Sequence, residues 1–227
     1  CRVELRKRFK GIMPPTFSEE KKLWQNGYQY VVGVDEVGRG SFAGPVVTAA
    51  VVWPQTKLRV IEKAGINDSK QLKPRQCECL ARFIKENSLA WDITEVGVSV
   101  INRIGIGKAT EKAMRKTVKD IMNKLSDGAP NLFVLVDYFY ISYLRGLGRR
   151  NQLGIKKGDQ KSISIAAASI LAKVYRDKLM LCLSEKHPQY GWARNKGYGT
   201  SEHQKALLRY GLTRYHRKAF VKTFLKR

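Results

Sequence analysis

No apolar run in the 227-residue sequence approaches the roughly 18 residues that a membrane-spanning helix requires. Cysteine is scarce: the four cysteines form no CxxC pair, and Cys77 and Cys79 point apart if their segment is helical. The three histidines lack zinc-finger spacing, and the basic start has no apolar signal segment. These absences exclude a membrane span, a disulfide framework and a zinc finger. We expect free thiols in a reducing cytoplasm, no membrane partner, and a monomer.

Acidic residues are also few, because 19 Asp and Glu stand against 43 Lys and Arg, a formal net charge of +24. So large an excess indicates a polyanionic partner, and nucleic acid is the first candidate, since each neutralised phosphate releases counterions. The alternative is a protein that is simply basic throughout. Denser basic groups occur at 6–10, 149–157, 194–196 and 214–227.

Hydrophobic periodicity and turn residues predict alternating strands and helices. The sequence from Thr16 to Glu19 has the form of a capping box, and Gly27 ends the short helix that follows. Strands are expected at 29–34, 45–53, 89–98 and 132–136, with another near 153–155. Helices are expected at 74–87, 107–125, 162–184 and 201–210, followed by a basic tail. This mixture predicts an α/β fold with helices layered on one sheet.

Acidic residues stand at the ends of two predicted strands. Asp35 and Glu36 follow the first strand, Asp137 follows the strand at 132–136, and Asp159 lies just before the long apolar helix. Sites in α/β sheets gather where strands end, and a cluster of carboxylates suits Mg²⁺ or Mn²⁺. We therefore predict one metal site from these four acids.

Each acid also has a purely structural interpretation. Asp35 and Asp137 could stabilise turns, Glu36 could pair with Arg39, and Asp159 could cap the following helix. Neighbouring strand residues point to opposite faces, so Asp35 and Glu36 converge only if the chain bends there.

Several ordered blocks together resemble type 2 ribonuclease H (ribonuclease HII). They begin with Gly-Val-Asp-Glu-Val-Gly-Arg-Gly at 33–40 and Ala-Gly-Pro-Val-Val at 43–47. The later blocks are Asn-Asp-Ser-Lys-Gln-Leu (67–72), Val-Leu-Val-Asp (134–137), Lys-Gly-Asp-Gln-Lys-Ser (157–162), Ala-Ala-Ala-Ser-Ile-Leu-Ala-Lys-Val (166–174) with Arg-Asp (176–177), Lys-Gly-Tyr-Gly-Thr (196–200) with Glu-His (202–203), and His-Arg-Lys-Ala-Phe (216–220). The blocks extend over residues 29–220.

The resemblance implies a ribonuclease H-like fold, with a central mixed sheet flanked by helices and a helical C-terminal part. It implies a basic N-terminal segment with a short helix (1–28), a catalytic domain (29–185) and a basic, substrate-binding part (186–227). The implied activity is metal-dependent cleavage of RNA in RNA–DNA hybrids and incision 5′ to single ribonucleotides in duplex DNA. The products would be 3′-hydroxyl and 5′-phosphate ends, and the context would be ribonucleotide excision repair and DNA replication.

The resemblance also assigns residues. Asp35, Glu36, Asp137 and Asp159 match the four catalytic, metal-binding acids. The loop Gly38-Arg39-Gly40 matches the one that reads the ribose 2′-hydroxyl, the group that distinguishes RNA from DNA. Tyr198 matches the tyrosine that stacks on the following deoxynucleotide sugar. Candidate phosphate contacts, each of which could instead be an ordinary surface group, are Lys70, Lys161, Ser162, Arg194 and Lys196.

This chain departs from the family pattern after the third acid, where Tyr138 stands in place of the usual glycine. The stretch from Asp137 to Asp159 is also longer and more basic than expected. Asp177 stands four residues after Lys173, as in a helical ion pair. The competing interpretations are a type 3 ribonuclease H, another ribonuclease H-like nuclease and a non-catalytic basic binding module. Four clustered acids argue against the last of these.

Overall fold

The structure is a computed structural model that describes residues 14–125, 131–138, 140–144 and 147–225. Its centre is a five-stranded mixed sheet in the order β3-β2-β1-β4-β5. The strands are β1 (Tyr30–Val37), β2 (Val46–Val52), β3 (Ala90–Val96), β4 (Leu132–Asp137) and β5 (Gln152–Ile155). The pairs β1–β2 and β2–β3 are antiparallel, whereas β4 runs parallel to both β1 and β5. The predicted α/β fold with a mixed sheet is confirmed.

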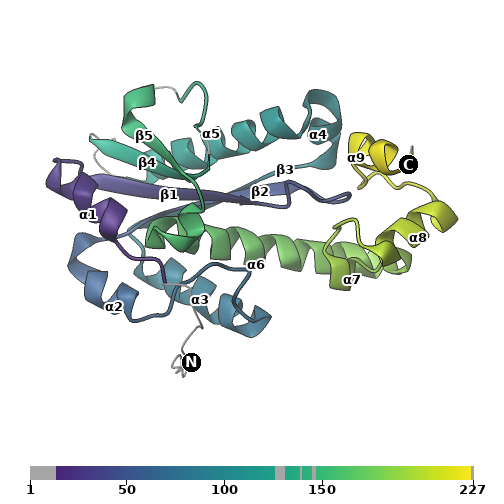
Figure 1. Cartoon of the computed structure of the whole chain (residues 1–227), viewed down its shortest axis with the longest axis horizontal. Coiled ribbons are helices and arrows are strands. Elements are labelled where there is room, and N and C mark those ends of the chain that lie inside the picture. The colour runs from purple at the N-terminus through teal and green to yellow at the C-terminus, as the bar shows by residue number, and fades with distance from the viewer. Residues whose placement is uncertain (1–13, 126–130, 139, 145–146, 226–227) are drawn as a thin grey trace.

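Helices cover both faces of this sheet (Figure 1). Helix α6 (Ile163–Lys186) packs on one face together with α3 (Pro74–Asn87), and α5 (Ile106–Lys124) covers the other. Beside them lie α1 (Ser18–Gln25), α2 (Leu58–Glu62) and α4 (Val98–Ile104), with single 3-10 turns at Gln55–Lys57, Arg149–Asn151 and Gly158–Gln160. The first half of α6 is buried all round, as its unbroken apolar sequence predicts.

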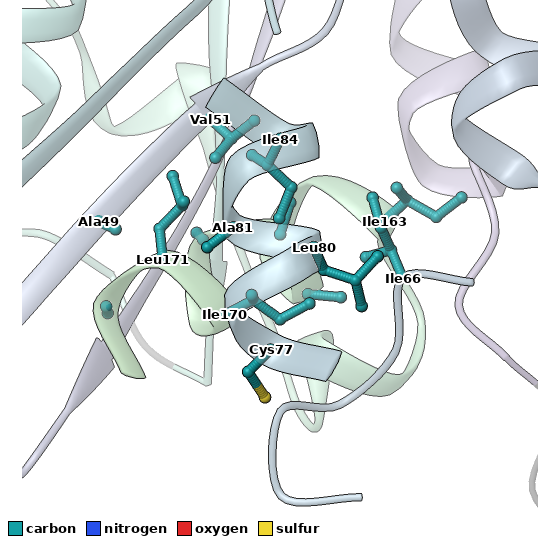
Figure 2. Close-up of a cluster of buried hydrophobic side chains, with 14 of the residues drawn as sticks. Ala49, Val51, Ile66, Cys77, Leu80, Ala81, Ile84, Ile163, Ile170 and Leu171 are labelled. Carbon is teal, nitrogen blue, oxygen red and sulfur yellow. The ribbon is translucent and has the colours of Figure 1, made fainter. Parts of the chain in front are cut away.

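Helix α6 approaches the sheet closely at Gly33 of β1. A Cβ atom at this position would lie 2.1 Å from the carbonyl carbon of Ser164, so only glycine lets α6 reach the strand. Figure 2 shows the adjoining core, in which Leu80 and Ile84 of α3 lie beside Ile170 and Leu171 of α6. This packing fixes the first half of α6 against the central strands.

The C-terminal part gathers at one end of the sheet, where the connection between β1 and β2 reaches toward it (Figure 1). It contains a 3-10 turn (Pro188–Tyr190), α7 (Trp192–Asn195), α8 (Ser201–Tyr210) and α9 (Lys218–Leu225). Its core includes Trp192 and two buried histidines, His203 and His216, whose Nε2 atoms lie 3.1 Å apart. The division of the chain at residues 28 and 185 stays a prediction.

Three local expectations were wrong. Strand β1 continues through Glu36 to Val37 because β2 pairs with it as far as Val37 opposite Val47. The capping box at Thr16 does not form: Phe17 precedes the helix, and the Thr16 hydroxyl bonds the Ser18 hydroxyl instead, at 2.7 Å. The expected basic tail contains helix α9, whose Val221 is fully buried.

Within the described ranges, no helix is long and apolar enough to cross a membrane. Cys77 is a buried free thiol and Cys182 an exposed one, as the isolated cysteines predicted.

Candidate active site

A cleft of about 830 Å³ opens where β1 leaves the sheet. Its walls come from the end of β1 and the loop after it, from α3 and α6, and from the segment that precedes α8. Three of the four predicted metal-binding acids, Asp35, Glu36 and Asp137, line this cleft together with the loop Gly38–Gly40 and Tyr198. Residues that lie far apart in the sequence thus face one space.

Asp35 and Glu36 line the same cleft although they are neighbours in a strand. Asp35 is 5% exposed, and its Oδ1 accepts a 2.7 Å hydrogen bond from the backbone N–H of Glu36. Glu36 Oε1 lies 4.0 Å from the Arg39 guanidinium, the pairing that the structural interpretation anticipated. The other oxygen, Glu36 Oε2, is buried without a hydrogen-bond partner within the part of the chain that the structure describes.

Asp137 ends β4, next to β1 in the sheet. Its Oδ1 accepts a 2.7 Å hydrogen bond from the N–H of Gly158, which brings the segment of the fourth acid to its side. Asp159 is 4% exposed, and its Oδ2 lies 3.3 Å from the Lys70 ammonium. Asp159 does not cap α6, because Ser162 occupies that position.

The electrostatics tie the four acids into one cluster. Burial, followed by the charges of Glu36 and Asp137, raises the pKa of Asp35 well above its ordinary range. Burial raises the pKa of Glu36 to about 7, with Asp137 adding to the rise and Arg39 opposing it. Burial also raises the pKa of Asp159, and the positive charge of Lys70 opposes this rise. Carboxylates that resist ionising together are stabilised by a divalent cation.

The donor set therefore fits a hard cation such as Mg²⁺ or Mn²⁺, and the unpartnered Glu36 Oε2 is an oxygen available to it. Over residues 14–125, 131–138, 140–144 and 147–225, no three His, Cys, Asp or Glu side chains already lie close enough to hold a metal ion. Binding would thus require these carboxylates to draw together, and the Lys70 ammonium now at Asp159 to move aside.

The loop Gly38–Gly40 lines the cleft directly after the two acids. Gly38 has φ +91°, and a Cβ there would lie 2.1 Å from Nε of Arg176, so this turn requires glycine. The Arg39 side chain is 47% exposed, and Gly40 has open space around its Cα. At Gly40 the backbone is therefore open to a close approach from the cleft.

Tyr198 also lines the cleft, from the segment before α8, although it is far from the acids in the sequence. It is 39% exposed, and its ring centroid lies 5.5 Å from the centre of the Arg176 guanidinium. Its N–H donates to the carbonyl of Asn195 at 2.9 Å. Tyr198 is thus partly exposed in the cleft, while a hydrogen bond holds its backbone.

Of the predicted phosphate contacts, some line the cleft and others lie outside it. Lys70 and Lys196 line the cleft, whereas Lys161 is exposed outside it. Arg194 forms an ion pair with Glu202 on the surface.

Ser162 does not fit its predicted role, because it is fully buried. Its hydroxyl donates to Glu20 Oε1 at 2.6 Å and accepts from the Ile165 N–H. The residue that begins α6 therefore has no surface to offer to a phosphate.

Sequence reasoning missed further residues of the cleft. Lys173 and Lys178 of α6 add positive charge to its wall, and the Ser169 side chain hydrogen-bonds Asp35. Ser169, Lys173 and Asp177 follow one another at four-residue spacing on α6, so the helical period placed Ser169 on the same face as the predicted pair Lys173 and Asp177. Arg176 stands in a block that carried the family resemblance but had been given no role.

Asp177 and Tyr138 are the two residues whose roles were open. Lys173 Nζ donates to Asp177 Oδ2 at 2.6 Å, which is the predicted helical ion pair, and both residues line the cleft. Tyr138 has φ +74° and is 68% exposed. It keeps a backbone conformation that glycine adopts without strain.

A mixed sheet with helices on both faces and acids at adjacent strand ends defines an α/β protein of the ribonuclease H-like class. The model of the family described as "Ribonuclease HII" matches residues 32–226. The chain is 44% identical over 207 residues to ribonuclease HII of Caldanaerobacter subterraneus subsp. tengcongensis, covering 91% of this chain and 80% of that protein. It is 43% identical to the Herpetosiphon aurantiacus protein, covering 89% and 93%. The chain belongs to the ribonuclease HII family, as predicted, and is a ribonuclease H-type endonuclease.

Solved structures of low sequence identity share the fold. Ribonuclease HII in a complex with PCNA from Archaeoglobus fulgidus aligns with a TM-score of 0.66 at 23% identity, over 85% of this chain and 94% of that one. Ribonuclease H2 from Pyrococcus horikoshii gives a TM-score of 0.65 at 23% identity, over 88% and 100%. The Mn²⁺ complex of Bst-RNase HIII gives 0.69 at 21% identity, over 90% and 73%.

Proposed function

We propose that this protein cleaves the RNA strand of RNA–DNA hybrids and incises duplex DNA on the 5′ side of a single embedded ribonucleotide, leaving 3′-hydroxyl and 5′-phosphate ends. The observation that carries the proposal is the shared cleft: the acids of β1 and β4, the loop Gly38–Gly40 and Tyr198 all line it. Membership of the ribonuclease HII family supports the same activity.

The proposed cofactor is Mn²⁺ or Mg²⁺, held by Asp35, Glu36, Asp137 and Asp159. A related fold, that of Bst-RNase HIII, has been solved with Mn²⁺. When bound, such ions would activate water and neutralise charge at the scissile phosphate. The protein's own part is to keep these four carboxylates together and largely out of water, with Gly158 N–H orienting Asp137 and Ser169 orienting Asp35.

Substrate selection would come from the loop and from Tyr198. The backbone at Gly38–Gly40 can approach a ribose closely enough to hydrogen-bond its 2′-hydroxyl. The apolar face of Tyr198 would favour the deoxyribose that follows, where a hydroxyl would be poorly solvated. Lysines of the wall, at 70, 173, 178 and 196, would contact phosphates of the duplex. We also propose a cytoplasmic role in ribonucleotide excision repair and DNA replication, in which the protein acts as a monomer.

The test is an incision assay on duplex DNA with one embedded ribonucleotide, beside an all-DNA duplex, with Mn²⁺ or Mg²⁺. We expect one cut 5′ to the ribonucleotide in the first duplex and none in the second. Asp137→Asn should abolish the cut, whereas Asp120→Asn should not, because Asp120 pairs with Lys116 on α5 away from the cleft. Equal cutting of both duplexes, or cutting without added metal in EDTA, would refute the proposal.

A further inference from the structure

Two arginines behind the cleft are fully buried, an unusual place for this side chain. Arg176 comes from α6, and Arg217 directly precedes α9. Among the described residues, neither guanidinium has a carboxylate oxygen within 4.0 Å. A buried charge without an ion pair requires hydrogen bonds to nearly all of its donors.

Arg176 hydrogen-bonds two segments, the connection between β1 and β2 and the segment that carries Tyr198. Its Nε donates to the carbonyl of Pro45 at 3.0 Å, and its Nη2 to the hydroxyl of Ser41 at 2.9 Å and the carbonyl of Ala43 at 3.1 Å. Its Nη1 donates to the carbonyl of Lys196 at 2.9 Å, two residues before Tyr198. One guanidinium therefore joins the segment after the glycine loop to the segment that carries the tyrosine.

Arg217 also hydrogen-bonds the connection between β1 and β2. Its Nε donates to the carbonyl of Gly44 at 3.0 Å and its Nη1 to the carbonyl of Arg39 at 2.9 Å. Its own N–H donates to the carbonyl of Phe42 at 2.7 Å. Burial and the nearby charge of Arg176 lower the pKa of Arg217 to about 9. Arg217 Nη2 is buried without a hydrogen-bond partner among the described residues. The carbonyls of this one loop are thus acceptors for both buried cations, and Arg217 depends on the two that it has.

We propose that Arg176 and Arg217 are positioning residues for sugar discrimination: they hold the Gly38–Gly40 loop and Tyr198 at a fixed separation. The loop can leave this conformation only by withdrawing carbonyls from a buried guanidinium, so the two charges fix its shape. Gly38 belongs to the same arrangement, since the space of its missing Cβ is filled by Arg176. The inference rests on the proposed function, because it concerns the distance between the group that reads the ribose and the ring that meets the next sugar.

The experiment compares wild type with Arg176→Lys and Arg217→Lys, which keep the charge but lose the planar set of donors. Hydrogen exchange of the loop is measured first, because the N–H groups of Phe42 and Ala43 donate to the carbonyl of Gly197 across the two segments. We expect these amides to exchange at least about tenfold faster in the lysine variants, with exchange in β4 unchanged.

Activity is then measured as kcat/KM on a duplex with one ribonucleotide and on a hybrid with a continuous RNA strand. Misplacing a substrate-positioning group by about 1 Å can lower the rate on the order of 10²-fold. We expect kcat/KM to fall by that factor on the single-ribonucleotide duplex and by less than about tenfold on the hybrid. The ratio compared is kcat/KM on the single-ribonucleotide duplex divided by kcat/KM on the hybrid. In the double variant Arg176→Lys, Tyr198→Ala, this ratio should be no lower than in Tyr198→Ala alone. Val118→Ala, on the buried face of α5, is the control for plain loss of stability and should leave the ratio unchanged.

Equal losses on both substrates, or unchanged exchange of the loop amides, would overturn the inference. If wild type fails to incise at the ribonucleotide, the proposed function falls, and the exchange rates still decide whether the arginines hold the loop. If Arg176→Lys does not fold, the same two measurements on Arg217→Lys decide the matter.

Discussion

Glu36 is expected to destabilise the metal-free protein, and its replacement by glutamine should make that protein more stable. Its side chain is 14% exposed, and one of its oxygens has no hydrogen-bond partner among the described residues. The pKa of Glu36 is about 7 in the folded state, against an ordinary value of 4.5. Because each pKa unit is worth about 1.4 kcal/mol, ionising Glu36 in the folded protein costs about 3 kcal/mol of stability.

The sign follows from proton binding. Because the folded state holds the proton more tightly, the cost of ionising Glu36 is fully present above pH 7 and disappears as the pH falls toward 4.5. In EDTA at about pH 8, Glu36→Gln should therefore exceed wild type in free energy of unfolding by up to about 3 kcal/mol. At about pH 4.5 the difference should be small. Saturating Mn²⁺ should reverse the order, since only wild type keeps the full set of ligands.

Urea unfolding followed by circular dichroism gives these free energies at each pH. The matched control is Glu185→Gln, an exposed carboxylate on α6, which should change stability by less than about 0.5 kcal/mol at either pH. A Glu36→Gln protein that is less stable than wild type in EDTA at about pH 8 would refute the electrostatic account of this site.

Three further predictions concern the frame of the site. Gly33→Ala should lower the free energy of unfolding in urea by about 3 kcal/mol, because its Cβ would overlap Ser164. Gly97→Ala, with nothing within 4 Å of the added Cβ, should cost no more than about 1 kcal/mol, the loss of a favourable N-cap residue of α4. At Tyr138, where φ is +74°, the glycine variant should be about 1 kcal/mol more stable than the alanine variant, since only glycine relieves the backbone; equal stabilities would contradict this strain. Burial and His203 lower the pKa of His216 to about 4 from 6.5, so stability should fall by up to about 3 kcal/mol as the pH drops from 6.5 to 4. His216→Gln should remove this part of the pH dependence, and an unchanged profile would count against the assignment.

Much of the fold could be predicted from local patterns. The run 132–136 was expected to be a strand covered on both faces, and it is the buried core of β4. The apolar start of the helix at 162–184 predicted burial against the sheet, which α6 has. The patterns were sufficient because burial on one face leaves a period in the sequence, and burial on all faces leaves an unbroken apolar run.

Elements that depend on distant partners could not be predicted in this way. Ser162 has the same sequence neighbourhood whether it meets a phosphate or Glu20, and only the packing of α1 on α6 decides between them. Helix α9 has no capping signal, and its Val221 becomes a core residue only because the C-terminal part folds back. Arg176 and Arg217 look like surface residues of a basic chain until the fold encloses them.

The sequence by itself determined which acids follow the strands, which glycines follow the acids, and to which family the blocks are similar. Tertiary structure decided that Asp35, Glu36 and Asp137 face one cleft with Tyr198, that Ser162 does not, and that two arginines without ion pairs lie behind it. The physical reason is that charge, burial and hydrogen bonding depend on neighbours in space. Those neighbours here come from segments as far apart as Arg39 and Arg217.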